Sequence, residues 1–109
     1  MKHYILNQDK IIQEVDLMTW LGWRKTDNKR LFKDSINNYI VSTVFLGIDH
    51  RIGFENDNKS DPVLFETMVF DNGEEVFCER YTSYQDAKSG HERVFKDYMK
   101  IQANKKGEE

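Results

Sequence analysis

The feature that most constrains the fold of this chain is a run of strand-forming residues at 38–49, NYIVSTVFLGID. A second run at 62–70, PVLFETMVF, has the same character. Val, Ile, Thr, Phe and Tyr suit a pleated, half-buried surface, so both runs predict β-strands. At ~3.3 Å per residue, the first strand would cross a whole small domain. Neither of its faces is plainly polar, which predicts a central strand covered on one side and partly on the other.

Turn residues before the first run predict a hairpin. Asn37-Asn38 stands between two strand-forming segments, and Asn tolerates positive φ better than other non-glycine residues. A two-residue turn here would pair Ile36 with Tyr39. The preceding strand would therefore lie next to the long one.

Asn72-Gly73 predicts a second hairpin more strongly. It would join the strand at 62–70 to a strand at 75–81 and place Glu66 opposite Glu79. In the same register Cys78 is expected to be a small buried side chain.

The N-terminal segment predicts a hairpin followed by a short helix. Residues 3–6 and 11–15 are short apolar segments separated by a polar turn. Asp16 is a suitable N-cap for a helix that begins at Leu17. One of the two tryptophans, Trp20 and Trp23, is expected in the core, and the other at the surface.

The C-terminal third predicts a long helix capped by Thr82 or Ser83. Its apolar positions recur at three- and four-residue steps and form a single stripe. The members of that stripe are Ala87, His91, Val94, Phe95, Tyr98 and Ile101. Residues 103–109 are expected to form a flexible tail.

These elements predict one α+β domain spanning residues 1–109. We expect a mainly antiparallel, twisted sheet of five or six strands, with the short helix in the N-terminal half and the long C-terminal helix packed on one face. A chain of 109 residues is long enough for one core and too short for two.

Composition restricts the partners. The formal net charge of -3 argues against direct binding of nucleic acid, which usually needs a basic excess. The single cysteine excludes an internal disulfide, and no zinc-ligand spacing occurs. No apolar run of membrane length is present, so a soluble protein of a reducing cytoplasm is expected, without cofactor or metal.

Three acidic or histidine positions are candidates for chemistry, and each has a structural explanation. Glu66 and Glu79, if opposite each other, would be a carboxylate pair. Asp49 and His50 follow the long strand, where a shuttle or metal ligand competes with a turn-forming Asp. His91, on the apolar stripe, is expected to be a hydrogen-bonded structural side chain. We expect no catalytic residue.

Several segments together resemble a family of small proteins encoded by bacteriophages and prophages. The resemblance is carried by VDLMTW, VSTVFLGIDH, LFETMVF and ERYTSYQDAKSGH, and it covers most of the chain. Members often have a Gly-rich loop after the Asp-His pair. Here the corresponding segment, HRIGFENDNKSD, is longer and more polar, so a function carried by that loop would differ.

The resemblance implies a non-enzymatic, anti-CRISPR-like protein that binds and inhibits a bacterial defence component in the host cytoplasm. A homodimer stays open. The expected partner surface combines the polar segment after the long strand with the short helix. Its residues are Trp23, Arg24, Arg51, Phe54, Glu55 and Asp57. Two alternatives remain: a small-ligand sponge or metal-dependent enzyme that uses Asp49, His50 and Glu66, and a structural or regulatory phage protein.

Overall fold

A computed structural model describes residues 2–26, 29–49 and 61–107. Within these ranges the elements follow in the order β1 (His3–Leu6), β2 (Ile12–Val15), α1 (Leu17–Arg24), β3 (Arg30–Ile36), β4 (Tyr39–Phe45), β5 (Phe65–Asp71), β6 (Glu74–Tyr81) and α2 (Tyr84–Gly107). The strands form two antiparallel sheets, β1-β2 and β3-β4-β5-β6. The α+β class is therefore confirmed, with the strands divided between two sheets.

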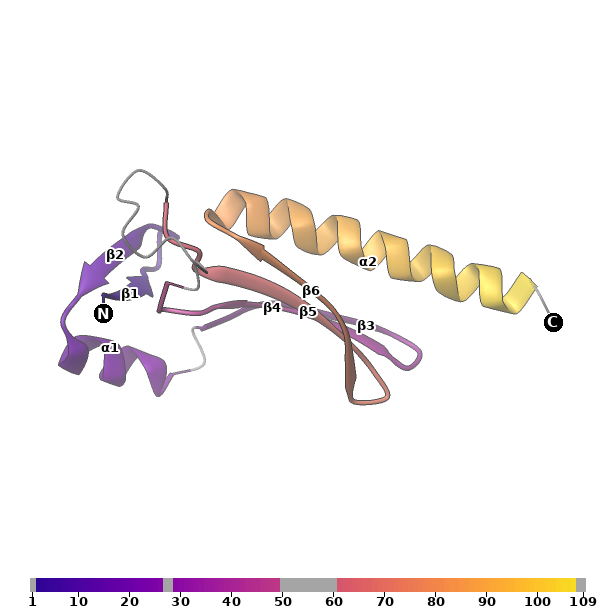
Figure 1. The fold of residues 1–109 in the computed structure, drawn as a ribbon, viewed down its shortest axis with the longest axis horizontal. Helices are drawn as coiled ribbons and strands as arrows, with labels where there is room; N and C mark the ends of the chain where they lie inside the picture. The colour runs from indigo at the N-terminus through magenta and orange to yellow at the C-terminus, as the bar shows by residue number, and fades with distance from the viewer. Residues whose placement is uncertain (1, 27–28, 50–60, 108–109) are drawn as a thin grey trace.

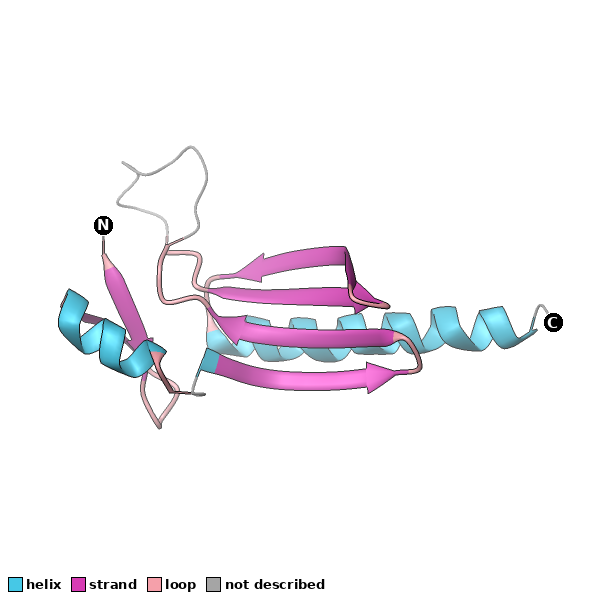
Figure 2. Ribbon diagram, turned by 90° about the horizontal axis from the view of Figure 1, so that it is seen from below, coloured by secondary structure: helices cyan, strands magenta, loops and turns pink. Residues whose placement is uncertain are grey.

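The molecule is elongated, with α2 lying along one face of the four-stranded sheet (Figure 1). The opposite face of the sheet has no described helix across it (Figure 2). The β1-β2 hairpin and α1 sit together at one end of the molecule, and α2 extends past the strands at the other end (Figures 1 and 2).

The position of α2 follows from its cap and its apolar stripe. The Asp86 backbone N–H donates to Ser83 Oγ at 3.0 Å, which makes Ser83 the cap. Ala87, His91 and Val94 are buried against the sheet, as the stripe predicts. Ile101, at the far end of the stripe, is exposed because α2 extends beyond the sheet there.

The first hairpin has the predicted register, with Ile36 paired to Tyr39. Asn37 has φ of +52°, the positive value that a tight hairpin turn needs at its first central position. Along β4, buried and half-buried residues alternate. The buried face of β4 lies under α2, and the half-buried face looks away from the helix.

The predicted strand at 38–49 is too long, because β4 ends at Phe45. Gly47 has φ of +78°, outside the range of a strand. A Cβ at Gly47 would lie 2.5 Å from Trp20 Nε1, so only glycine lets α1 approach this closely. Ile48 then forms a β-bridge with His3, which joins the N-terminal hairpin to the end of β4.

The predicted register of the second hairpin is wrong by one residue. Asn72 and Gly73 form the turn, both with positive φ, but the ladder shifts between Val69 and Phe70. Val76 is the extra residue, since Phe70 pairs with Glu75 and Val69 pairs with Phe77. A shift of one residue moves every following side chain to the other face of the strand.

Two residues change their predicted environment through this bulge. Glu66 lies opposite Arg80, so the expected Glu66–Glu79 pair does not exist. Cys78 is exposed rather than buried. Partial burial and the neighbouring Glu66 raise the pKa of the Cys78 thiol, which disfavours a reactive thiolate.

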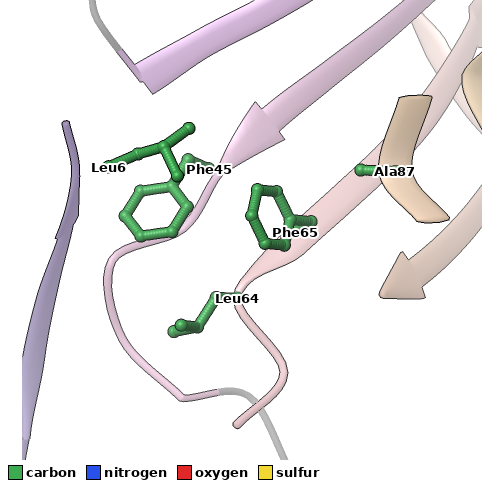
Figure 3. Close-up of a cluster of buried hydrophobic side chains, with 5 residues drawn as sticks. All are labelled: Leu6, Phe45, Leu64, Phe65 and Ala87. Carbon is green, nitrogen blue, oxygen red and sulfur yellow. The ribbon is translucent and has the colours of Figure 1, made fainter. Parts of the chain in front are cut away.

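Two buried clusters form the core. The first joins β1, β4, β5 and α2 through Leu6, Phe45, Leu64, Phe65 and Ala87 (Figure 3). The second lies further along the sheet and contains Tyr39, Val41, Val69 and Val94. The first cluster thus attaches the N-terminal hairpin, and the second attaches the middle of α2.

We predict that Val94→Asp unfolds the domain. Val94 is 2% exposed and packs against Val41 and Val69, so the substitution buries a charge without a partner, at a cost of several kcal/mol. Thermal melting followed by circular dichroism measures the effect. Lys96→Asp, at an exposed position of the same helix, is the control. A wild-type melting temperature for Val94→Asp would contradict the packing of α2.

Candidate functional site

A chain of hydrogen bonds runs from the surface into the core through His91. Its Nε2 donates to Asp34 Oδ2 at 2.7 Å, and its Nδ1 lies 2.7 Å from Thr43 Oγ1. Thr43 Oγ1 is in turn 2.5 Å from Thr67 Oγ1. These side chains come from β3, β4, β5 and α2, so the chain connects the helix to three strands.

This arrangement has the residue types of an activated nucleophile, but its hydroxyls are inaccessible. Thr43 and Thr67 are 0% exposed, and only Asp34 reaches the surface. The chain therefore satisfies buried polar groups and fixes α2 on the sheet. This agrees with the structural role expected for His91.

The other acidic candidates are held by single partners. Arg80 Nε donates to Glu66 Oε2 at 2.9 Å on the face of the sheet turned away from α2. Glu79 instead accepts a hydrogen bond from Arg93 of α2. Opposite charges across these contacts remove the reason for a split carboxylate pair.

Asp49 has the turn-forming role that competes with catalysis. Its Oδ1 accepts a hydrogen bond from the Val63 backbone N–H at 2.8 Å, which ties together the two ends of the segment between them. His50 lies outside the described residues. In the described part of the chain, no group of three His, Cys, Asp or Glu side chains is arranged to hold a metal ion.

Of the residues expected to bind a partner, the structure describes Trp23 and Arg24. Trp23 is half-buried and packs edge-on against Phe45, with ring centroids 5.4 Å apart. Trp20 is buried too, so neither tryptophan stands free at the surface. Arg24 is exposed, and its guanidinium lies over the Trp20 ring at 5.3 Å. The remaining expected residues, Arg51, Phe54, Glu55 and Asp57, lie outside the described residues.

The start of α1 exposes apolar side chains. Asp16 Oδ1 accepts a hydrogen bond from the Thr19 backbone N–H at 2.8 Å, and this bond lowers the pKa of Asp16. The cap fixes the direction of the helix, and the helix buries only Trp20 completely. Met18 and Leu17 remain 75% and 51% exposed. Sequence reasoning missed this pair, although a helix of eight residues has little room to bury a second stripe.

A cluster of positive charge follows directly. Five of the ten residues from 24 to 33 are Lys or Arg, against one acidic residue. The five are Arg24, Lys25, Lys29, Arg30 and Lys33, and all are exposed. None of them forms an ion pair with another described residue. The overall charge of -3 hid this cluster, because a sum over the chain says nothing about its distribution.

Together, the exposed residues Leu17, Met18, Arg24 and Lys25 form what we call the α1 surface. It lies at the end of the molecule away from the C-terminus of α2 (Figure 1). Apolar side chains occupy its first turn and cations its last. Such a surface can bind another molecule, but it contains no nucleophile or proton donor placed for catalysis.

On the sheet side of α2, Tyr81 is in an unusual environment. Its hydroxyl is buried and has no hydrogen-bond partner among the described residues. A Cβ at Gly90 would come within 2.4 Å of that hydroxyl, so the glycine lets the ring lie against α2. Burial is the main cause that raises the pKa of Tyr81 to about 12.

Comparisons with known proteins identify no relative: no protein-family model matches the chain, and no curated protein or solved structure does so either. The resemblance to phage-encoded proteins therefore stays a prediction. Among the described helices, none is long and apolar enough to cross a membrane.

We predict that Tyr81→Phe leaves the stability at pH 7 unchanged or raises it by up to about 1 kcal/mol, since it removes a buried, unsatisfied hydroxyl. The unfolded chain releases the tyrosine proton at a pKa of about 10, whereas the folded protein holds it up to about pH 12. Wild-type stability should therefore fall as the pH rises through this window, and the fall should be smaller in the variant.

Urea unfolding between pH 7 and pH 12 measures both effects. Tyr84→Phe removes a tyrosine hydroxyl from the neighbouring start of α2 and serves as the control. A loss of more than about 1 kcal/mol at pH 7 in Tyr81→Phe would show that the hydroxyl has a stabilising partner.

Proposed function

We propose that this protein acts by stoichiometric binding rather than catalysis, and that it binds a bacterial protein through the α1 surface. The observation that carries the proposal is the composition of that surface. Leu17 and Met18 are exposed at one end of the helix, and Arg24 and Lys25 are exposed at the other. Methionine and arginine are both enriched at protein interfaces.

The exposed apolar side chains favour a partner. Met18 is the most exposed of the large hydrophobic side chains in the described part of the chain, and Leu17 is next to it. Covering them would bring ~25 cal/mol for each Å² of apolar surface removed from water. The cap at Asp16 and the burial of Trp20 hold the helix in place, so little ordering is needed on binding.

The charge of the surface indicates an acidic partner. Arg24 and Lys25 continue into Lys29, Arg30 and Lys33 without an ion pair among the described residues. Exposed charges of one sign speed association with a surface of the opposite sign and limit binding to wrong partners. The apolar end of α1 favours a protein over nucleic acid, because phosphate contacts would leave Leu17 and Met18 in water.

The non-enzymatic part of the proposal is supported by the state of the candidate catalytic groups. Glu66 is bonded to Arg80, and the hydroxyls of Thr43 and Thr67 are buried behind His91. Asp49 closes a turn. Each group has a structural role that explains its position, and no described geometry favours the ligand-sponge or metal-enzyme alternative.

The biological setting rests on the resemblance alone. A phage-encoded protein of this size that binds a bacterial protein would act as an inhibitor of a defence component, in the manner of anti-CRISPR proteins. A structural or regulatory phage protein would use the same kind of surface. Identification of the bound protein distinguishes these two settings.

We predict that Arg24→Glu with Lys25→Glu weakens partner binding at least about ten-fold, because it reverses the charge that meets the acidic surface. The melting temperature should not change, since both side chains are exposed. The partner is first recovered by affinity purification from the bacterial host, and its affinity is then measured by titration calorimetry. Lys88→Glu with Lys96→Glu, two exposed positions on α2, is the matched control. Equal affinities for the two charge-reversed proteins would rule out the α1 surface.

We also predict that Asp49→Ala and Glu66→Ala each keep the partner affinity within about three-fold of wild type, as expected for residues outside an interface. Both variants are checked for native circular dichroism before titration. Loss of the biological activity in a folded variant that still binds the partner would instead support catalysis or ligand capture at these carboxylates.

A further inference from the structure

The outer edge of the four-stranded sheet at β6 is unpaired. Among the described strands, β6 pairs only with β5, so its other edge has no neighbour. An edge strand presents a row of backbone N–H and C=O groups that can pair with another chain. Natural proteins usually block such an edge with charge, a bulge or a covering segment.

The two halves of β6 differ in this respect. The first half carries Glu74, Glu75 and the bulge at Val76, which are devices that protect an edge. From Phe77 to Tyr81 the ladder with β5 is regular. The second half of the strand therefore keeps the geometry that a further strand requires.

A cleft of about 500 Å³ lies along this second half, between the edge of β6 and α2. Arg80, Tyr81 and Thr82 line its strand side, and Asp86, Ser89 and Arg93 line its helix side. The volume falls in the range of ~300–1,000 Å³ that is typical of ligand sites. The combination of a free strand edge with a helix alongside is suited to an extended peptide.

The chemistry of the lining also suits a peptide. The Arg93–Glu79 ion pair connects helix and strand at the cleft, and Asp86 and Ser89 add an acceptor and a hydroxyl on the helix. The backbone edge of β6 would supply affinity through main-chain hydrogen bonds. The charged side chains would supply specificity, as in other sites where a strand is added to a sheet.

We propose that the edge of β6 beside α2 binds an extended segment of another protein, which adds to the sheet as a fifth strand. This site is separate from the α1 surface, which lies on the other end of the chain's fold, and the two proposals can fail independently. It requires no movement of the core, because the cleft is already open between β6 and α2.

The probe is a set of 12-residue peptides selected on the wild-type protein from a random library, then synthesised with a fluorescent label. Ser89→Trp fills the cleft from an exposed position on α2 and should weaken peptide binding at least ten-fold in fluorescence polarisation. Glu92→Trp adds the same side chain at an exposed position outside the cleft and should bind like wild type. Hydrogen exchange of the β6 amides should slow when a peptide binds.

Three results would overturn the proposal. The library might yield no peptide that binds above background, or Ser89→Trp and Glu92→Trp might bind equally well. Slowed exchange in α1 with no change in β6 would place the peptide elsewhere. A wild-type dimer in light scattering that Ser89→Trp dissociates would assign the edge to a second copy of this chain instead of a partner segment. Arg24→Glu with Lys25→Glu, which tests the α1 surface, should leave peptide binding at β6 unchanged.

Discussion

The packing of α2 across the four-stranded sheet is the interaction on which the rest of the structure depends. Ala87, His91 and Val94 place the helix on the buried face, and His91 adds hydrogen bonds that reach Asp34 at the surface and Thr43 in the core. Apolar contact supplies most of the favourable free energy, while the polar chain fixes one position of the helix on the sheet. Without this helix, one face of β3 to β6 would lie open to water.

Because one long helix covers one face, the remaining surfaces are available for binding. The opposite face of the sheet carries the Glu66–Arg80 pair. The hairpin and α1 are attached at one end through Leu6 and the close contact of Gly47 with Trp20. The edge of β6 stays unpaired among the described strands. Both proposed sites therefore lie at the periphery of the fold, where side chains and backbone are not needed for the core.

Local signals in the sequence predicted the elements well and their registers less well. Asn37 and the Asn72-Gly73 pair specify tight turns through their tolerance of positive φ, and both turns form. The bulge at Val76 has no comparable signal, since it depends on how β6 meets the twisted neighbouring strand. That single residue moved Cys78 to the surface and replaced an expected carboxylate pair with an ion pair.

The sequence by itself determined the α+β class, the capped helices, the buried stripe of α2 and the structural role of His91, because these follow from periodicity and from residues close together in the chain. Only the tertiary structure decided where β4 ends, since Gly47 is fixed by its approach to Trp20. It also decided that Met18 stays exposed, that cations gather beside it, and that a cleft opens next to β6. These features depend on contacts between segments far apart in the sequence, and no local pattern encodes them.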